Sequence, residues 1–268
     1  MDRPDWAPGD IDLARPSAAR VYDYYLGGSH NFAVDRELAE QAIALWPDLP
    51  LIMRANRAFL RRAVRFCLDS GIRQFLDLGS GIPTVGNVHE VARAVDPDAR
   101  VVYVDSDPVA VIHSRAILDG DERTAVVHGD LRDPAAVLSS AEARRLLDPD
   151  EPVALLMVAV LHFVPDADDP AGIVSRYAKE MAPGSCLVLS HATHEGQPQH
   201  AGPHQRLYAR TSTPLRMRSH AEVTALFDGF ELVDPGLVLL TQWRPDPTDE
   251  PDEHPERFSG YAGVGRKP

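Results

Sequence analysis

The spacing of hydrophobic residues along the chain changes near residue 70. In the first part, apolar side chains recur every three or four residues, which is the spacing of amphipathic helices. Three helices are expected: a short one stopped by two adjacent glycines, one over 35–45 and one over 51–71. We therefore predict a helical lid or appendage formed by residues 1–70.

From residue 71 onward, short Val- and Leu-rich segments alternate with helical ones. The strand-like segments read QFLDL, RVVYVD, TAVVHGD, PVALLMV and CLVLSH. This alternation predicts a parallel sheet covered by helices on both faces. Two late apolar segments, 230–243 and 260–265, are expected to add strands. Residues 71–268 thus read as one α/β domain.

Local signals predict where some helices begin. Asp169 precedes a proline, an arrangement typical of a helix start, and Ser219 with Glu222 forms a capping-box pattern. Residues 193–214 are rich in glycine, proline and histidine. We interpret that segment as a long loop over the edge of the sheet.

Composition narrows the class of protein. The 268 residues are 44% hydrophobic and 25% charged, as in a globular protein, and the net charge is −13. That charge opposes binding to nucleic acid or to an anionic membrane surface. No segment is long and apolar enough for a membrane span, and the first ten residues lack a signal-peptide pattern. We expect a cytoplasmic protein with neither nucleic-acid nor membrane partners.

The first predicted strand ends in an acid that is followed by a glycine-rich loop. Asp77 precedes Gly79 and Gly81, which allow a tight turn and let a ligand approach the backbone. A dinucleotide-binding loop would carry a third glycine. Here Pro83 instead removes an N–H that could hold a pyrophosphate. The loop therefore weakens, without excluding, an NAD(P) site.

The next two strand ends also carry acids. Asp105 is positioned to accept hydrogen bonds from both hydroxyls of an adenosine ribose. The alternative is a helix-capping acid, a role that Asp107 fits better. Asp130 would accept from the exocyclic amine of adenine, with a simple turn acid as its alternative. Because parallel strands end at one edge of a sheet, the three acids predict one nucleoside site.

With these residues in place, the sequence resembles the class I S-adenosylmethionine-dependent methyltransferases over about residues 73–265. DLGSG, VVYVD and GDLRD stand where that family has its acidic glycine loop, ribose acid and adenine acid. The resemblance implies a Rossmann-like fold, with a seven-stranded, mostly parallel sheet whose last strand is antiparallel. RVYDYYLGGSHNF, RANRAFLRRAVRF and GIPTVGNVHEVA further resemble actinobacterial S-adenosyl methyltransferases of unknown substrate.

The resemblance implies S-adenosylmethionine as the cofactor and S-adenosylhomocysteine as its product. Asp77 would attract the cationic ammonium and sulfonium groups. An amino-acid tail has no phosphates, so Pro83 is tolerable. Expected cofactor contacts are Tyr22, His30, Asp77, Gly79, Ser80, Gly81, Pro83, Asp105, Ser106, Asp130, Leu131 and Ala159.

The fourth strand end bears on the reaction. Its sequence AVLHFVPD lacks the Asn/Asp-Pro-Pro-Tyr motif of amide or base methylation, and the chain has no Pro-Cys pair for attack on a pyrimidine. His162 resembles the histidine base of small-molecule O-methyltransferases. The alternative is a packing or cofactor-adjacent histidine.

Several residues allow two interpretations. Tyr22 and Tyr25 either contact the cofactor from a lid or pack on the core as neighbours on one helix face. Asn56 and Arg57 either reach the methionine carboxylate or, as we favour, belong to a solvated helix face. The histidines within 191–204 lack ligand spacing, so we expect no metal site.

Methyl transfer from S-adenosylmethionine to oxygen or nitrogen of a small-molecule acceptor is the function that these features favour. A non-catalytic protein that binds an adenosyl ligand is the first alternative, and an NAD(P)-dependent oxidoreductase is the second. The sequence identifies neither the acceptor nor the oligomeric state, for which a homodimer is one option.

Overall fold

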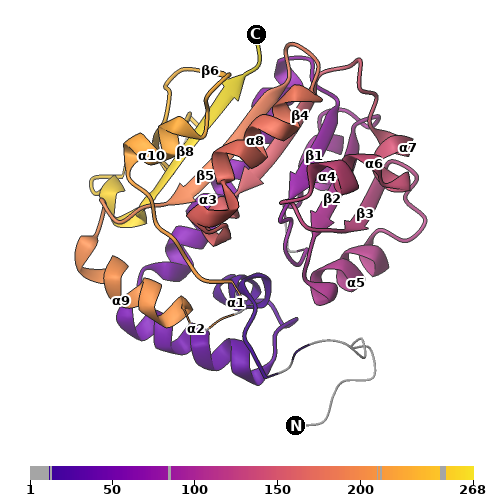
Figure 1. The fold of residues 1–268 in the computed structure, drawn as a ribbon. Coiled ribbons are helices and arrows are strands. Elements are labelled where there is room, and N and C mark those ends of the chain that lie inside the picture. Colours follow the sequence, from indigo (N-terminus) through magenta and orange to yellow (C-terminus); the bar gives the residue numbers. More distant parts are fainter. Residues whose placement is uncertain (1–11, 13, 84–85, 210, 212, 248–251) are drawn as a thin grey trace.

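The structure is a computed structural model that describes residues 12, 14–83, 86–209, 211, 213–247 and 252–268. Eight strands form one sheet (Figure 1). Their bounds are β1 Gln74–Leu78, β2 Arg100–Asp105, β3 Thr124–His128, β4 Val153–Val158, β5 Cys186–Ala192, β6 Glu231–Leu232, β7 Val238–Leu239 and β8 Gly260–Arg266.

The strand order is β3-β2-β1-β4-β5-β8-β6, and β7 also pairs with β8. Strands β1 to β5 are parallel, whereas β8 runs antiparallel to β5 with Cys186 opposite Arg266. This confirms the predicted α/β sheet with an antiparallel last strand. The count is eight instead of seven because 230–243 forms two short strands, β6 and β7, both antiparallel to β8. The winding reverses between β1 and β4, where sheets of this kind bind ligands.

Helices surround the sheet. Those of the first part are α1 Ala18–Tyr25, α2 Ala33–Leu45 and α3 Leu49–Asp69. Those that follow are α4 Val88–Arg93, α5 Pro108–Ile117, α6 Pro134–Ser139, α7 Ala141–Leu146, α8 Pro170–Lys179, α9 Pro198–Tyr208 and α10 His220–Ala225. Short 3-10 turns cover η1 Leu161–Phe163, η2 Asp166–Asp168 and η3 Pro255–Phe258.

Three predicted helix starts are confirmed. The side chain of Asp107 accepts a hydrogen bond from the Val109 N–H at the start of α5. Asp169 caps α8 in the same manner, and Ser219 opens α10 with a complete capping box. Each cap satisfies a backbone donor that has no partner within its helix.

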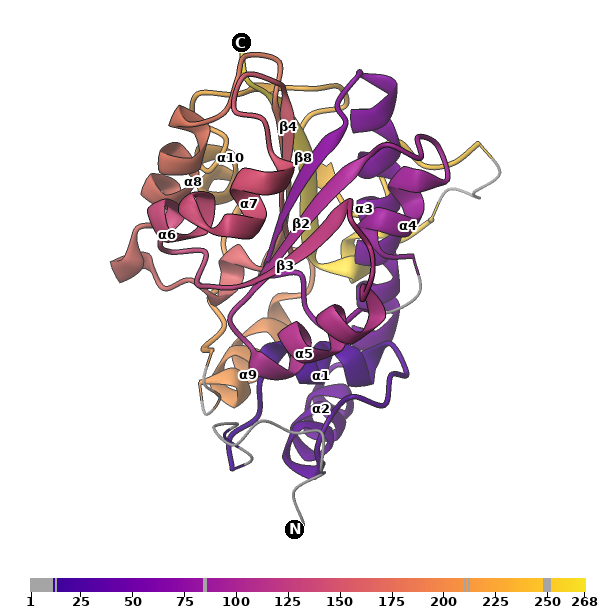
Figure 2. The same cartoon turned by 90° about the vertical axis from the view of Figure 1, so that its right-hand side faces the viewer.

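Helices cover both faces of the sheet, as the side view shows (Figure 2). Two hydrophobic cores lie on these opposite faces. Alternate residues of β1 feed them: Phe75 points into one core and Leu76 into the other. Helix α3 packs on the first face, and its Phe59, Val64 and Leu68 are buried there. The division at residue 70 stays a prediction. In packing terms, however, α3 belongs to the core of the sheet.

The loop predicted over 193–214 is wrong for half of its length, because Pro198–Tyr208 forms α9. Pro203 lies inside this helix and supplies no N–H, so one intrahelical bond is missing. Burial of one face of the helix compensates for the missing hydrogen bond, because Ala201, His204 and Tyr208 face the interior at helical spacing. The glycine and proline content hid that spacing in the sequence.

Helices α1, α2 and α9 lie together at the end of the sheet where β1 to β4 finish (Figure 1). We call these three helices the cap. A buried ion pair holds it in place, since Nε of Arg20 lies 3.3 Å from an Asp35 oxygen and 3.7 Å from an Asp107 oxygen. The Ser17 hydroxyl also donates to Asp107. Asp107 belongs to the start of α5, so the cap is fixed to the α/β domain.

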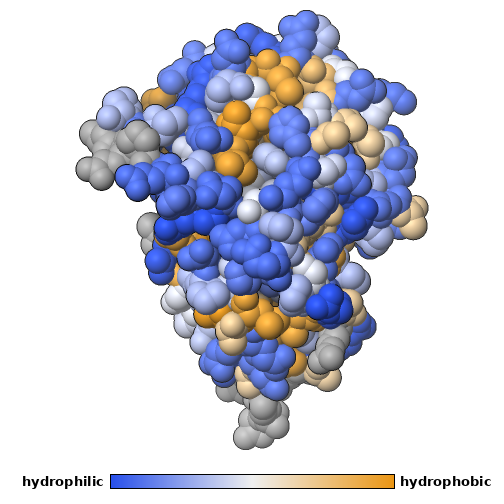
Figure 3. Space-filling model, turned by 90° about the vertical axis from the view of Figure 1, so that its left-hand side faces the viewer, coloured by the Kyte–Doolittle hydropathy of each residue, from blue (hydrophilic) through white to orange (hydrophobic). Residues whose placement is uncertain are grey.

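Figure 3 shows the face of the molecule on the β8 side, and most of this face is hydrophilic. Hydrophobic side chains gather in two areas, one in the upper half of the face and one over the cap. Large exposed hydrophobic residues in the described chain come from separate elements: Leu45, Val95, Ile117 and Leu232. Among the described helices, none is long and apolar enough to cross a bilayer.

Candidate functional site

A charged cavity opens where β1, β2, β3 and β4 end. We call it the charged cavity because acids and arginines line it. Asp77, Asp105 and Asp130 all border this one space. The convergence of three strand-end acids, on which the sequence interpretation depends, is therefore present in the fold.

Most of the predicted cofactor contacts border the charged cavity: Tyr22, Asp77, Gly79, Ser80, Gly81, Asp105, Ser106, Asp130, Leu131 and Ala159. The described lining does not include Pro83 or His30. The His30 ring instead packs against that of His113 on α5, with centroids 4.0 Å apart. His30 lies in the short loop after α1, and this contact holds its ring against α5.

The loop after β1 depends on its glycines. Gly79 has a φ of +70°, and a Cβ there would lie only 2.2 Å from a methyl carbon of Val160. Gly81 has a φ of +67° and faces open space. Both conformations are left-handed, which disfavours any side chain. The loop therefore leaves a clear surface for a ligand.

Asp105 organises the floor of the charged cavity. One carboxylate oxygen accepts from the Gly81 N–H at 2.7 Å, and the other accepts from the Asp107 N–H at 2.8 Å. Each oxygen keeps a further lone pair for a ligand hydroxyl. Burial raises the pKa of this carboxyl to about 6, although the backbone donors counteract part of the effect. Asp105 is thus mostly ionised at neutral pH.

Asp77 is buried without a comparable set of donors. Desolvation raises its pKa to about 7, while the nearby positive charge of Arg57 lowers it. A carboxyl group in this state gains most from a cation placed beside it. The buried Ser80 hydroxyl has no hydrogen-bond partner in the described structure and borders the same space.

Asp130 is more exposed and is already paired. The Arg132 guanidinium donates to both of its oxygens, with Nε 3.0 Å and 2.9 Å away, and also reaches Asp168 at 2.8 Å. These bonds hold the pKa of Asp130 below its usual value, so it stays ionised.

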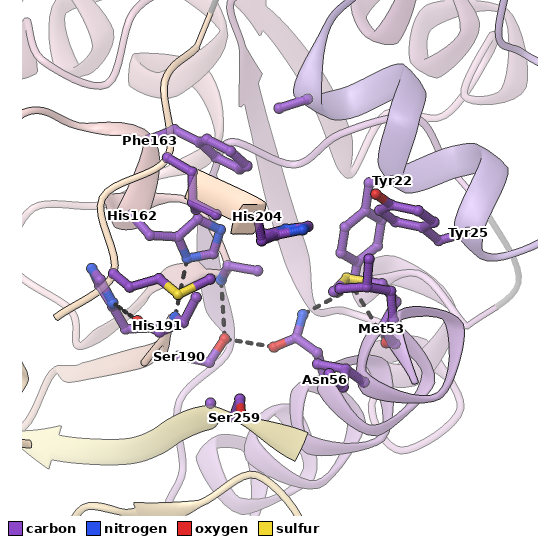
Figure 4. A pocket seen from close by; sticks show the side chains of 18 of the residues that line it. Tyr22, Tyr25, Met53, Asn56, His162, Phe163, Ser190, His191, His204 and Ser259 are labelled. Atoms are coloured by element: carbon purple, nitrogen blue, oxygen red, sulfur yellow. Dashed lines mark hydrogen bonds between the residues drawn. The ribbon is translucent and has the colours of Figure 1, made fainter. Parts of the chain in front are cut away.

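A second, apolar cavity adjoins the first. We call it the apolar cavity (Figure 4). Apolar and aromatic side chains from the cap, α3, η1 and β5 form most of its walls. The two cavities share five lining residues: Ala18, Tyr22, Asn56, Ala159 and Phe163.

Hydrogen bonds link the shared wall into one chain (Figure 4). The Ala159 N–H donates to the Ser190 hydroxyl at 3.0 Å, and that hydroxyl donates to the Asn56 amide oxygen at 2.5 Å. The Asn56 amide then donates to the Tyr22 hydroxyl at 2.9 Å. Tyr22 in turn donates to the Met53 carbonyl at 3.4 Å. Ala159 has a φ of 56°, a strained conformation that such a network can maintain.

His162 borders the apolar cavity and does not border the charged one. Its ring is buried, and Nδ1 accepts from the Ala192 N–H at 3.3 Å. Desolvation, with smaller contributions from His191, Arg218 and His204, holds its pKa well below the usual value. The imidazole is therefore neutral at pH 7.

Two further histidines border the apolar cavity. His191 accepts from Arg218 at Nε2, 2.9 Å away, and donates from Nδ1 to the Ala192 carbonyl at 2.8 Å. His204 on α9 has a buried Nδ1 with no partner in the described structure. Burial lowers their pKa values to about 3 and about 4. In the described chain, no group of His, Cys, Asp and Glu has metal-binding geometry.

The solvated-face interpretation of Asn56 and Arg57 is wrong. Asn56 is only 4% exposed and belongs to the shared wall, and Arg57 borders the charged cavity. Arg57 also donates to the Gly86 carbonyl at 3.0 Å. The sequence did contain a signal for Asn56. Helical spacing places this polar residue on the otherwise apolar face of α3. Ser17 and Phe163 were missed altogether, since neither stands in a recognisable pattern.

The architecture is that of class I, Rossmann-like methyltransferases. N-methyltransferase NodS from Bradyrhizobium japonicum, solved with S-adenosyl-L-homocysteine, shares the fold with a TM-score of 0.52 at 15% identity. The match covers 93% of this chain and 99% of NodS. At that identity, the likeness establishes the fold alone.

Two solved structures are much more similar. A DUF574 family protein from Streptomyces avermitilis is 43% identical, with a TM-score of 0.91 over 96% of this chain and 99% of that one. A candidate methyltransferase from Thermobifida fusca is 42% identical, with a TM-score of 0.91 over 98% and 99%. No curated protein matches the chain.

The sequence model of the S-adenosyl methyltransferase family matches residues 4–268. The chain therefore belongs to that family, as an S-adenosylmethionine-dependent methyltransferase. The resemblance seen in the sequence is confirmed, including its link to actinobacterial proteins.

Proposed function

We propose that the protein transfers the methyl group of S-adenosylmethionine, bound in the charged cavity, to a small molecule bound in the apolar cavity. The observation that carries this proposal is the wall that the two cavities share. A donor in one cavity and an acceptor in the other would meet at that wall. Bound S-adenosylmethionine supplies a methyl group that is already activated on a positively charged sulfur.

The residues of the charged cavity fit this cofactor. Asp105 keeps lone pairs for two ribose hydroxyls, and Asp130 offers an ionised acceptor for an adenine amine. Within the described chain, no cation bonds directly to Asp77, which would gain an ammonium partner. Arg57, which also borders the charged cavity, supplies positive charge for a carboxylate. Gly81 leaves the backbone accessible to the amino-acid tail.

The residues of the apolar cavity fit an acceptor that must be dehydrated and aligned. Alignment and exclusion of water are the main contributions that a protein makes to methyl transfer. Met53, Phe163 and Tyr208 supply apolar surface around the space. We retain a small-molecule acceptor, methylated on oxygen or nitrogen, because apolar and aromatic side chains with a few polar groups line the cavity, as in small-molecule sites.

Calorimetry tests the cofactor assignment. S-adenosylhomocysteine should bind with one site per chain, whereas NADH should not bind. NADH binding without S-adenosylhomocysteine binding would instead support the oxidoreductase alternative. Transfer of a labelled methyl group from S-adenosylmethionine into a metabolite extract tests turnover. Tight cofactor binding with no transfer into any extract would favour the binding-only alternative.

A further inference from the structure

The apolar cavity carries no net charge. Its described lining contains no aspartate, glutamate, lysine or arginine. Burial lowers the pKa values of His162, His191 and His204, so all three imidazoles are neutral at pH 7. Transfer of a charged group into such surroundings is costly unless a partner compensates it. The cavity therefore selects against ionised acceptors.

Ring side chains line one continuous stretch of the apolar cavity. Phe163 stacks on Tyr208 with centroids 6.1 Å apart and an angle of 28° between the rings. Tyr208 neighbours His204 at 4.8 Å, and His204 meets Trp46 edge-on at 5.7 Å. Aromatic surfaces of this kind favour a ligand that is itself a flat ring.

Most polar groups of the apolar cavity are already occupied. Ser190, Asn56 and Tyr22 bond to one another in the shared wall, and both ring nitrogens of His191 have partners. His204 has a buried Nδ1 with no partner in the described structure, and His162 is the second exception. Its Nδ1 accepts from the Ala192 N–H, and a neutral imidazole then carries its proton on Nε2. No hydrogen bond engages that Nε2–H within the described chain.

We infer that the acceptor is an uncharged, ring-containing molecule that presents an oxygen or nitrogen lone pair to the Nε2–H of His162. The inference rests on the proposed function, because it concerns the acceptor of the same transfer. In this arrangement His162 donates a hydrogen bond and orients the acceptor. It cannot also remove a proton from it while Nδ1 keeps the Ala192 bond, so the role of general base is replaced by that of a recognition donor. A lone pair of the acceptor forms the bond to the methyl carbon as the bond from that carbon to sulfur breaks. S-adenosylhomocysteine leaves, and a proton carried by the acceptor atom passes to water.

Three naphthalene probes separate the elements of this inference. 1-Acetonaphthone is neutral and carries a carbonyl acceptor, naphthalene lacks the acceptor, and 1-naphthoate is charged. Each is titrated by ligand-observed NMR against the full chain saturated with S-adenosylhomocysteine. We expect 1-acetonaphthone to bind about 2- to 12-fold more tightly than naphthalene, the range of one hydrogen bond. 1-Naphthoate should bind at least about 100-fold more weakly than 1-acetonaphthone.

Variants then test His162 itself. His162→Ala should reduce 1-acetonaphthone to the affinity of naphthalene and leave naphthalene unchanged, and His162→Gln, which keeps an N–H donor, should restore part of the preference. His254→Ala, at an exposed histidine, is the matched control and should change nothing. Calorimetry with S-adenosylhomocysteine on each variant verifies that the fold is intact.

Each contrary outcome contradicts one specific claim. Equal binding of 1-naphthoate would overturn the uncharged class, and a carbonyl preference that survives His162→Ala would overturn the donor role. If S-adenosylhomocysteine binds but no probe does, the ring-containing class is wrong while the proposed function stands. If S-adenosylhomocysteine itself does not bind, the proposed function fails.

Discussion

The two neighbouring cavities are built by different means. The charged cavity takes its acids from the ends of successive strands, so Asp77, Asp105 and Asp130 follow one another along the sequence in a regular order. The apolar cavity takes its rings from α1, α2, η1 and α9, which are far apart in the chain. The proposed cofactor site thus follows from the topology of the sheet. The proposed acceptor site forms only when distant segments pack.

The difference extends to energetics. Directional hydrogen bonds to ionised groups dominate the charged cavity, and removal of one partner leaves a buried group unsatisfied. Dispersion and loss of water dominate the apolar cavity, so no single side chain carries most of the affinity. Substitutions in the first cavity should therefore have larger and more localised effects than those in the second.

The largest effect is expected from Asp105→Ala. Ligand hydroxyls lose an ionised acceptor, and the Gly81 and Asp107 amides lose their partner. Binding of S-adenosylhomocysteine should weaken by about 1–3 kcal/mol in calorimetry, while the apolar probes bind as before. Asp119→Ala, which removes an exposed acid, serves as the control. An unchanged affinity in a folded Asp105 variant would contradict the assignment.

Asn56→Ala should affect both cavities at once, because Asn56 joins Ser190 to Tyr22 in the shared wall. Loss of both partners should lower the free energy of unfolding by about 1–3 kcal/mol. Chemical denaturation measures this change. Arg54→Ala, at an exposed position of the same helix, should stay within about 0.5 kcal/mol of the parent. Equal stability of the two variants would show that the wall does not depend on this chain of bonds.

The pH dependence of cofactor binding should distinguish the cavities further. Burial raises the pKa of Asp77 to about 7, and a cationic ligand binds the ionised form. Affinity for S-adenosylhomocysteine should rise with pH and level off above pH 7. Each pH unit below that value costs about 1.4 kcal/mol. Calorimetry on Asp77→Asn should give a weaker affinity with a flatter profile, whereas a flat profile in the parent would refute the ammonium role.

The raised pKa of Asp77 also affects the stability of the folded protein in the absence of ligand. The folded pKa of Asp77 lies above the value of about 4 that an unfolded aspartate has. Protonation of this group therefore favours the folded state. Its contribution is fully present below about pH 4 and is lost as the pH rises through 7.

A pair of glycine substitutions gives the smallest contrast. Gly202→Ala, inside α9, should raise the free energy of unfolding by about 0.5–1 kcal/mol, since an added Cβ would meet only an Arg206 nitrogen at 3.4 Å. Gly81→Ala should lower it by about 1–2 kcal/mol because its φ of +67° disfavours a side chain. Thermal melts measure both changes. Shifts of the same sign would refute the argument from backbone conformation.

Much of the fold could be read from hydrophobic spacing. The five parallel strands have short apolar runs that no other element explains, and the caps at Asp107, Asp169 and Ser219 are local motifs. Helix α9 was missed because Gly202 and Pro203 are poor helix formers, and only tertiary burial favours the helix there.

The candidate site likewise has one part that the sequence predicted and one part that it did not. The strand-end acids were predicted because their spacing follows from the fold. The roles assigned to them remain predictions. Asn56 and Phe163 could not be placed, since their position depends on how α3 and η1 pack against the ends of the strands. For His162, the sequence indicates a histidine near the acceptor, but the choice between donor and base depends on the Ala192 N–H, a backbone group that no side-chain pattern reveals.

The junction of Ser17, Arg20 and Asp107 sets a rule for re-engineering this enzyme. Asp107 receives the cap on one side, and its backbone amide supports Asp105 on the other. Grafting a foreign cap to obtain a new product would therefore disturb the floor of the charged cavity unless these three residues are transferred with it. Variation confined to α9 and the end of α2 leaves that junction untouched, and it is where a library for altered selectivity is best placed.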